Sequence, residues 1–205
     1  MQDLNDQQKE ILLKDRIPPR MAEVYLCGFM ARLLIRSGGE PPATLTIADR
    51  VSCEFASLKE LTDPILDTGI MMCRVLMDFL GISSRRQPEP DGSLEQLAKP
   101  KYPDDMTLLN FGMPFISLNQ AIQGYPPYTS DRIEKALLRT LRTANRGIGH
   151  LTPILARTLD LEDLDIACQT FVGLVNRHLY EALGYEPIAP PVVKLLGTSG
   201  ELNDP

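Results

Sequence analysis

One segment of the chain, which begins at Thr62 or Asp63 and continues through Leu80, predicts a helix that is apolar nearly all round. Pro64 falls in its first turn, where a proline is well tolerated, and Gly81 supplies a stop signal. A helix without a polar face is usually enclosed by other helices. The segment therefore predicts the centre of a helical bundle.

Three further segments carry helical periodicity and helix-terminal signals, at residues 18–36, 130–150 and 161–183. A shorter helix is expected around residues 5–14. These segments surround the central one in the sequence and supply the apolar faces that it needs. We therefore expect an all-α fold, a compact helical bundle of four to five main helices.

The remaining stretches are rich in proline or polar residues. Residues 81–106 contain four prolines and charges of both signs, which predicts a long Pro-rich surface loop. Residues 40–55 predict another loop that holds a short extended piece at 43–47 and returns to helix near Ala48.

The length of 205 residues suits one domain of ordinary size. We assign residues 1–184 to a single helical-bundle domain and residues 185–205 to a Pro-containing C-terminal tail. Apolar residues make up 43% and charged residues 23%, which is typical of a soluble globular protein. The net charge of -6 argues against broad attraction to nucleic acid or anionic lipid, although a local basic patch remains open.

Compartment and membrane association follow from three further features. The two most apolar stretches, residues 24–35 and 69–82, are short for a bilayer span and contain charges, so they predict core helices and no membrane partner. The first ten residues are polar and do not resemble a signal peptide. The four cysteines are widely separated in apolar surroundings, as in proteins of a reducing compartment. We expect a cytoplasmic protein.

The strongest candidate site lies on the helix expected at residues 130–150. At ~100° per residue, five basic residues and a histidine fall within an arc of roughly 80°. They are Arg132, Lys135, Arg139, Arg142, Arg146 and His150. The opposite side is an apolar stripe for core packing. A solvated surface helix of ordinary kind is the favoured interpretation of this face, and a site for a phosphate or a partner is the alternative.

The end of this helix makes the alternative worth pursuing. Gly147 and Gly149 lie just before His150 in the sequence. Each glycine inside a helix lowers the stability of the helix by about 1 kcal/mol relative to alanine. A histidine exchanges a proton near neutral pH, and an arginine stabilises charge on a phosphoryl group. Such a pair would support metal-independent RNA cleavage. The simpler interpretation is that His150 bonds a free carbonyl at the helix end.

Two sequence patterns together resemble HEPN-like helical proteins over roughly residues 63–183. One is the Asn-Arg-x-x-x-His run at residues 145–150, and the other is the Arg-x-Leu-x-x-Phe-Leu run at residues 74–80 of the buried helix. The resemblance implies a small helical bundle, often dimeric. It also implies, for many members, RNase activity from an Arg-x(4 to 6)-His motif at the dimer interface.

On this resemblance His150 would be the family histidine, with Arg146 or Arg142 as its partner. Three residues separate Arg146 from His150, and seven separate Arg142 from it, so neither spacing matches the motif. A HEPN-like protein that binds partners without catalysis therefore ranks ahead of an active RNase.

Other candidate groups point to structure. The acidic run at residues 160–165 lies at a predicted helix N-terminus and is assigned to capping. His178 projects toward an apolar face and is assigned a structural role. Because the two histidines are far apart and no close cysteine pair exists, we expect no metal, and the absence of a phosphate-binding loop predicts no cofactor.

Three functions remain open for this chain. The first is a noncatalytic intracellular binding or regulatory module, the second a metal-independent RNase, and the third a helical enzyme acting on a small anionic substrate. The catalytic candidates are His150, Arg146 and Arg142; the anion or partner-binding candidates are Arg132, Lys135, Arg139 and Asn145. The candidate partners are a second copy of the chain, an RNA or another protein.

Overall fold

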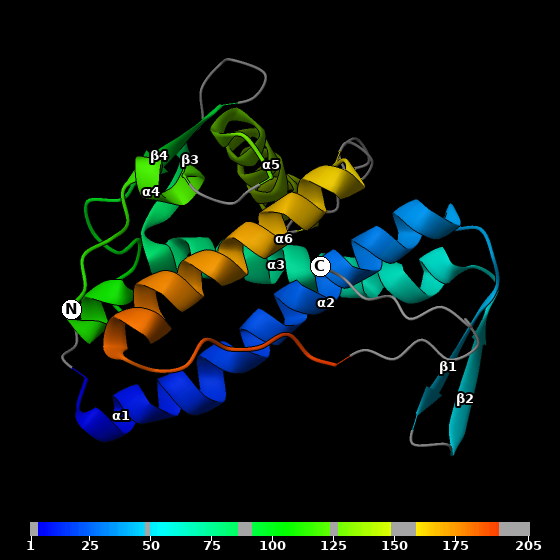
Figure 1. Cartoon of the computed structure of the whole chain (residues 1–205), viewed down its shortest axis with the longest axis horizontal. Coiled ribbons are helices and arrows are strands. Elements are labelled where there is room, and N and C mark those ends of the chain that lie inside the picture. Colours follow the sequence, from blue (N-terminus) through cyan, green and yellow to red (C-terminus); the bar gives the residue numbers. More distant parts are fainter. Residues whose placement is uncertain (1–3, 48–49, 86–91, 124–126, 149–158, 193–205) are drawn as a thin grey trace.

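The computed structural model describes residues 4–47, 50–85, 92–123, 127–148 and 159–192 (Figure 1). The fold is predominantly helical, as the sequence predicts. It is not purely α, because the described residues also form two small antiparallel sheets of two strands each.

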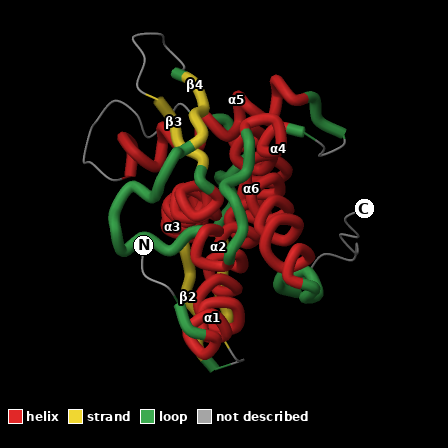
Figure 2. The backbone as a smooth tube through the Cα atoms, turned by 90° about the vertical axis from the view of Figure 1, so that its left-hand side faces the viewer, coloured by secondary structure: helices red, strands yellow, loops and turns green. Residues whose placement is uncertain are grey.

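Three long helices form the body: α2 (Ile17–Ser37), α3 (Leu58–Leu80) and α6 (Leu161–Val175). They pack on one another, and α5 (Ser130–Arg142) packs on α6 and α3 (Figures 1 and 2). The central position expected for the apolar segment is confirmed, since α3 contacts all three other helices. This helix begins one turn earlier than expected, because the Ser57 side chain accepts a hydrogen bond from the Glu60 amide and caps it.

The N-terminal helix α1 (Asp6–Ile11) continues into α2 through a π-helical turn at Leu12–Arg16. Pro18 and Pro19 follow, and neither can donate a main-chain hydrogen bond. The Leu13 carbonyl, which would face Pro18 in π-helical pairing, instead accepts the Tyr180 hydroxyl at 2.8 Å. This buried bond ties the start of the chain to the end of the last helix.

Helix α6 extends through a π-helical turn at Asn176–Tyr180 and a short 3₁₀ turn at Glu181–Leu183, and it stops at Gly184. The expected helix over residues 161–183 is confirmed. The tail then lies against the body at Ile188, whose amide and carbonyl both bond the Asn176 side chain, at 2.9 and 3.2 Å. The sequence also predicts that an apolar cluster at residues 192–196 straps onto the body; Val192 is 87% exposed, and residues 193–196 lie outside the described residues.

Strands β1 (Ala43–Ile47) and β2 (Val51–Phe55) form an antiparallel hairpin between α2 and α3. The extended piece at 43–47 is confirmed. The return to helix near Ala48 is wrong, because a second strand follows; Ala48 itself lies outside the described residues. Figure 1 shows the hairpin extending away from the helical body.

Strands β3 (Ile82–Arg85) and β4 (Ser93–Gln96) form a second hairpin, so the surface loop expected over residues 81–106 is wrong in part. Ile82 is fully buried and Leu94 is 6% exposed, because this hairpin packs against α5 and α4 (Leu118–Ile122). A 3₁₀ turn at Leu108–Phe111 precedes α4. No helix in the described part of the chain is long and apolar enough to cross a membrane.

Candidate functional site

Helix α5 carries most of the predicted site and has the two faces that its sequence predicts. Thr129, the residue before the first helical residue Ser130, is its N-cap and accepts a hydrogen bond from the Arg132 amide. Ile133, Leu137 and Leu141 are buried on the apolar side. The chain then passes into a π-helical turn at Thr143–Ile148, a rare form that occurs frequently at functional sites.

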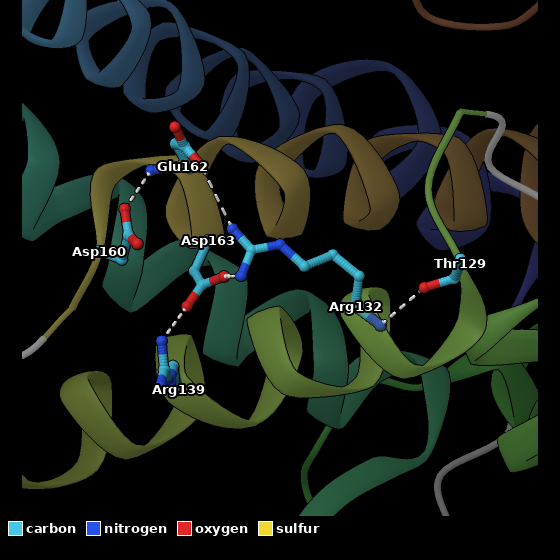
Figure 3. A network of polar contacts seen from close by, with 6 residues as sticks. All are labelled: Thr129, Arg132, Arg139, Asp160, Glu162 and Asp163. Carbon is cyan, nitrogen blue, oxygen red and sulfur yellow. Dashed lines mark hydrogen bonds and ion pairs between the residues drawn. The ribbon is translucent and has the colours of Figure 1, made fainter.

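The basic side of α5 faces an acid on α6 (Figure 3). Asp163, in the first turn of α6, has a fully buried side chain. Its Oδ1 lies 2.5 Å from a guanidinium nitrogen of Arg132, and its Oδ2 lies 2.5 Å from one of Arg139. Arg132 and Arg139 are seven residues apart, about two turns, so both reach the same carboxylate. We call this group of three residues the Asp163 joint.

Two further acids, Glu162 and Asp160, lie at the edge of the Asp163 joint. The exposed Glu162 lies 3.4 Å from the second terminal nitrogen of Arg132. Asp160 accepts the Glu162 amide at 2.9 Å and caps α6, which confirms the capping assignment for that residue. Asp163 has a further role that the assignment missed, because it joins two helices. The helix N-terminus also favours the negative charge of its carboxylate.

A second acid of α6 is held in the same way by α2. A guanidinium nitrogen of Arg32 lies 2.5 Å from Oδ1 of Asp165. The other carboxylate oxygen, Oδ2, accepts a hydrogen bond from the side-chain amide of Gln169 at 3.0 Å. Tyr128 lies near this pair: desolvation, and then the charge of Asp165, raises the pKa of its hydroxyl. The acidic run at the start of α6 is therefore bound to both neighbouring helices.

The predicted site residues thus have different surroundings. Arg132 and Arg139 meet on Asp163, while Lys135, on the same helix, is exposed to solvent. Arg142, the last residue of α5, and Asn145, in the π-helical turn that follows, are half-buried. The side chain of Arg146 and all of His150 lie outside the described residues, so their pairing stays a prediction.

The other titratable groups are placed as core or surface residues. Cys27, Cys73 and Cys168 are buried where α2, α3 and α6 meet, and the Cys73 and Cys168 sulfurs are 3.9 Å apart. Burial raises the pKa of the Cys73 thiol, which disfavours the reactive thiolate. Desolvation, followed by the charge of Arg177, lowers the pKa of the half-buried His178. Within the described ranges, no group of three or more His, Cys, Asp or Glu residues is arranged to hold a metal ion.

Comparison of the chain with protein-family models, with curated proteins and with solved structures gives no match.

The Asp163 joint has no direct signal in the sequence, because the periodicity of α5 indicates which residues share a face and says nothing of what that face meets. A weaker signal exists in α6. Asp163 and Asp165 flank Leu164 in a helix that is apolar on several sides, so two carboxylates at that spacing cannot both face water. Buried carboxylates require cationic partners, and the arginines of α5 are candidates for that role.

Proposed function

We propose that this chain is a noncatalytic binding protein of HEPN-like type, in which the basic face of α5 serves mainly to join two helices. The observation that carries the proposal is the Asp163 joint. A carboxylate with a fully buried side chain already neutralises part of the charge of Arg132 and Arg139, two of the five basic residues on the face. A phosphate or RNA backbone would have to compete with it.

The two catalytic alternatives depend on the same face. An RNase would use His150 with Arg146 or Arg142, and an enzyme on a small anionic substrate would need the arginines to be available for that substrate. The π-helical turn at Thr143–Ile148 supports both alternatives, because such turns occur frequently at functional sites. The Asp163 joint argues against both, because it already engages two of the arginines. We therefore rank them below the binding function. The cytoplasmic location remains part of the proposal, supported by the free thiols packed in the core.

The contact surface that we assign to the binding function is one face of the β1–β2 hairpin. The register pairs Leu45 with Cys53 and Ile47 with Val51, so apolar side chains from both strands share a face. That face consists of Ala43, Leu45, Ile47, Val51, Cys53 and Phe55. Ile47 and Val51 are 55% and 53% exposed. Because a lone two-stranded hairpin is at best marginally stable in water, a partner that covers this face would stabilise it.

The partner to which we commit is a second copy of the chain. Glu54 is the only charged residue within the two strands, and the register places it on the opposite face with Thr44. The apolar face therefore lacks the charges that are depleted from interface cores. A second copy presents the same apolar face, so two copies related by a twofold axis can each cover the hairpin of the other.

Replacing Ile47 and Val51 together by threonine is expected to convert a dimer into a monomer. Threonine keeps the β-branched shape that strands favour and adds a hydroxyl that resists burial without a partner. Sedimentation velocity from micromolar to submillimolar concentration measures the change, and circular dichroism checks that the helices are retained.

The matched control is Thr46→Ala, on the polar face of the same hairpin, which should leave the dimer intact. A wild-type chain that sediments as a monomer over the whole range contradicts the proposed partner. So does a double variant that remains as dimeric as the wild type.

A further inference from the structure

A cavity of about 350 Å³ lies at the opposite end of α2 and α3 from the β1–β2 hairpin. It opens where the π-helical turn at Leu12–Arg16 meets the C-terminal half of α3 and residues 105 and 106. Its apolar lining comes from Leu12, Ile17, Val75, Leu76, Phe79 and Met106. Its volume and mainly apolar lining fall within the range of small-molecule sites.

The two acids that line the cavity, Asp78 and Asp105, each have a polar partner. Asp78 is held by Lys101, whose Nζ lies 2.7 Å away, and Asp105 accepts the Tyr102 amide at 2.9 Å. Arg16 and Arg20 also line the cavity, one helical turn apart on the same face.

The charged residues that line the cavity are balanced, with two cations, Arg16 and Arg20, and two anions, Asp78 and Asp105. Lys101, which is not part of the lining, pairs with Asp78, and Asp105 is engaged by the Tyr102 amide. Arg16 and Arg20 are therefore the cations that a carboxylate ligand would meet at the mouth of the cavity.

The helix geometry at the cavity wall is also of a kind that is found at functional sites. A π-helical turn is rare and occurs frequently at functional sites. Here it immediately precedes Pro18 and Pro19 and brings Leu12 and Arg16 to the cavity. The Arg20 guanidinium donates to the Arg16 carbonyl at 2.5 Å, so this side chain is held beside the turn.

We propose that this cavity binds a small amphipathic carboxylate, with its hydrocarbon chain against Leu76 and Phe79 and its carboxylate at Arg16 and Arg20. Arginine suits this task because its guanidinium can donate two parallel hydrogen bonds to one carboxylate. The size of the cavity selects a chain of medium length, such as that of decanoate. The site is separate from the hairpin, so it does not depend on the proposed dimer.

Decanoate, below the concentration at which it forms micelles, is the probe, and isothermal titration calorimetry is the measurement. We expect one molecule to bind per chain. Arg16→Gln should weaken binding about tenfold, because Arg16 is exposed and its loss removes a charge without disturbing the core. Val75→Glu, at a position that is 40% exposed at the rim, should weaken binding at least as much by placing a carboxylate beside the ligand.

Two controls separate a built site from general adsorption of a surfactant. Lys59→Gln removes one positive charge from the exposed first turn of α3, at the opposite end of that helix from the cavity, and should leave the affinity unchanged. Decyltrimethylammonium, which has the same tail and the opposite charge, should bind at least tenfold more weakly than decanoate. Equal binding of the two amphiphiles, an unchanged affinity in Arg16→Gln, or no heat with decanoate each overturns the proposal.

Discussion

Asp163→Asn is expected to lower the free energy of unfolding by about 3 kcal/mol. Removing one partner of a buried ion pair costs about 3–5 kcal/mol, because the remaining charge is left without compensation. Here the side chains of Arg132 and Arg139 are 30% and 33% exposed, so they can turn partly toward water, and the lower end of that range applies. Urea unfolding followed by circular dichroism measures the loss.

Glu162→Gln is the matched control for Asp163→Asn. Glu162 also pairs with Arg132, but its side chain is 67% exposed, and exposed ion pairs contribute at most about 1 kcal/mol. The control should therefore stay within about 0.5 kcal/mol of the wild type. If Asp163→Asn is equally neutral, the two arginines do not depend on the buried carboxylate.

Gly69→Ala is expected to be as damaging as the loss of Asp163, at about 3 kcal/mol, or to prevent folding. A methyl group at residue 69 of α3 would lie 2.2 Å from the Cys27 Cβ and 2.7 Å from its sulfur on α2. These atoms belong to a buried side chain close to its backbone, so the two helices would have to separate. The gain in helix propensity, about 1 kcal/mol, is smaller than this cost.

Gly28→Ala provides a graded comparison in the same core. Its added methyl group would meet Asp165 Oδ1 and Cys168 Cβ at 3.1 Å, a contact that small shifts can relieve. We expect a loss below about 1.5 kcal/mol for this variant in the same urea measurement. An alanine at residue 69 that leaves stability at the wild-type level contradicts the close approach of α2 and α3.

The main helices could be predicted from the sequence because their signals are local. Ser37-Gly38-Gly39 ends α2, Asp160 caps α6, and Gly184 ends the extended last helix. Each is a short-range effect of side chain or backbone on the next turn, so a single chain suffices to find it. The central place of α3 also follows from its composition, since an apolar helix needs partners on every side.

The two hairpins were harder to predict because strands of four or five residues carry a weak periodic signal. Residues 81–106 contain enough proline and charge to resemble a solvated loop, and Ile82 and Leu94 are the only apolar residues within β3 and β4. They are buried against α4 and α5, which come later in the chain. Only the tertiary arrangement shows that these two positions share a face.

The sequence predicts which residues of α5 share a face, but it does not predict the contact of that face with α6. The amphipathic pattern of α5 correctly placed Arg132 and Arg139 on one face. It could not show that Asp163, a residue of the next long helix, pairs with both of these arginines. The cavity at Arg16 and Phe79 is equally hidden from the sequence, because its walls come from three separate segments.

The most direct test of a noncatalytic function is an assay of RNA degradation in the presence of EDTA. In this assay we expect the purified wild-type chain to degrade single-stranded and structured RNA no faster than the buffer blank. His150→Ala and Arg146→Ala should give the same result as the wild type. Degradation that persists in EDTA and disappears in either variant would contradict the account and establish the RNase alternative.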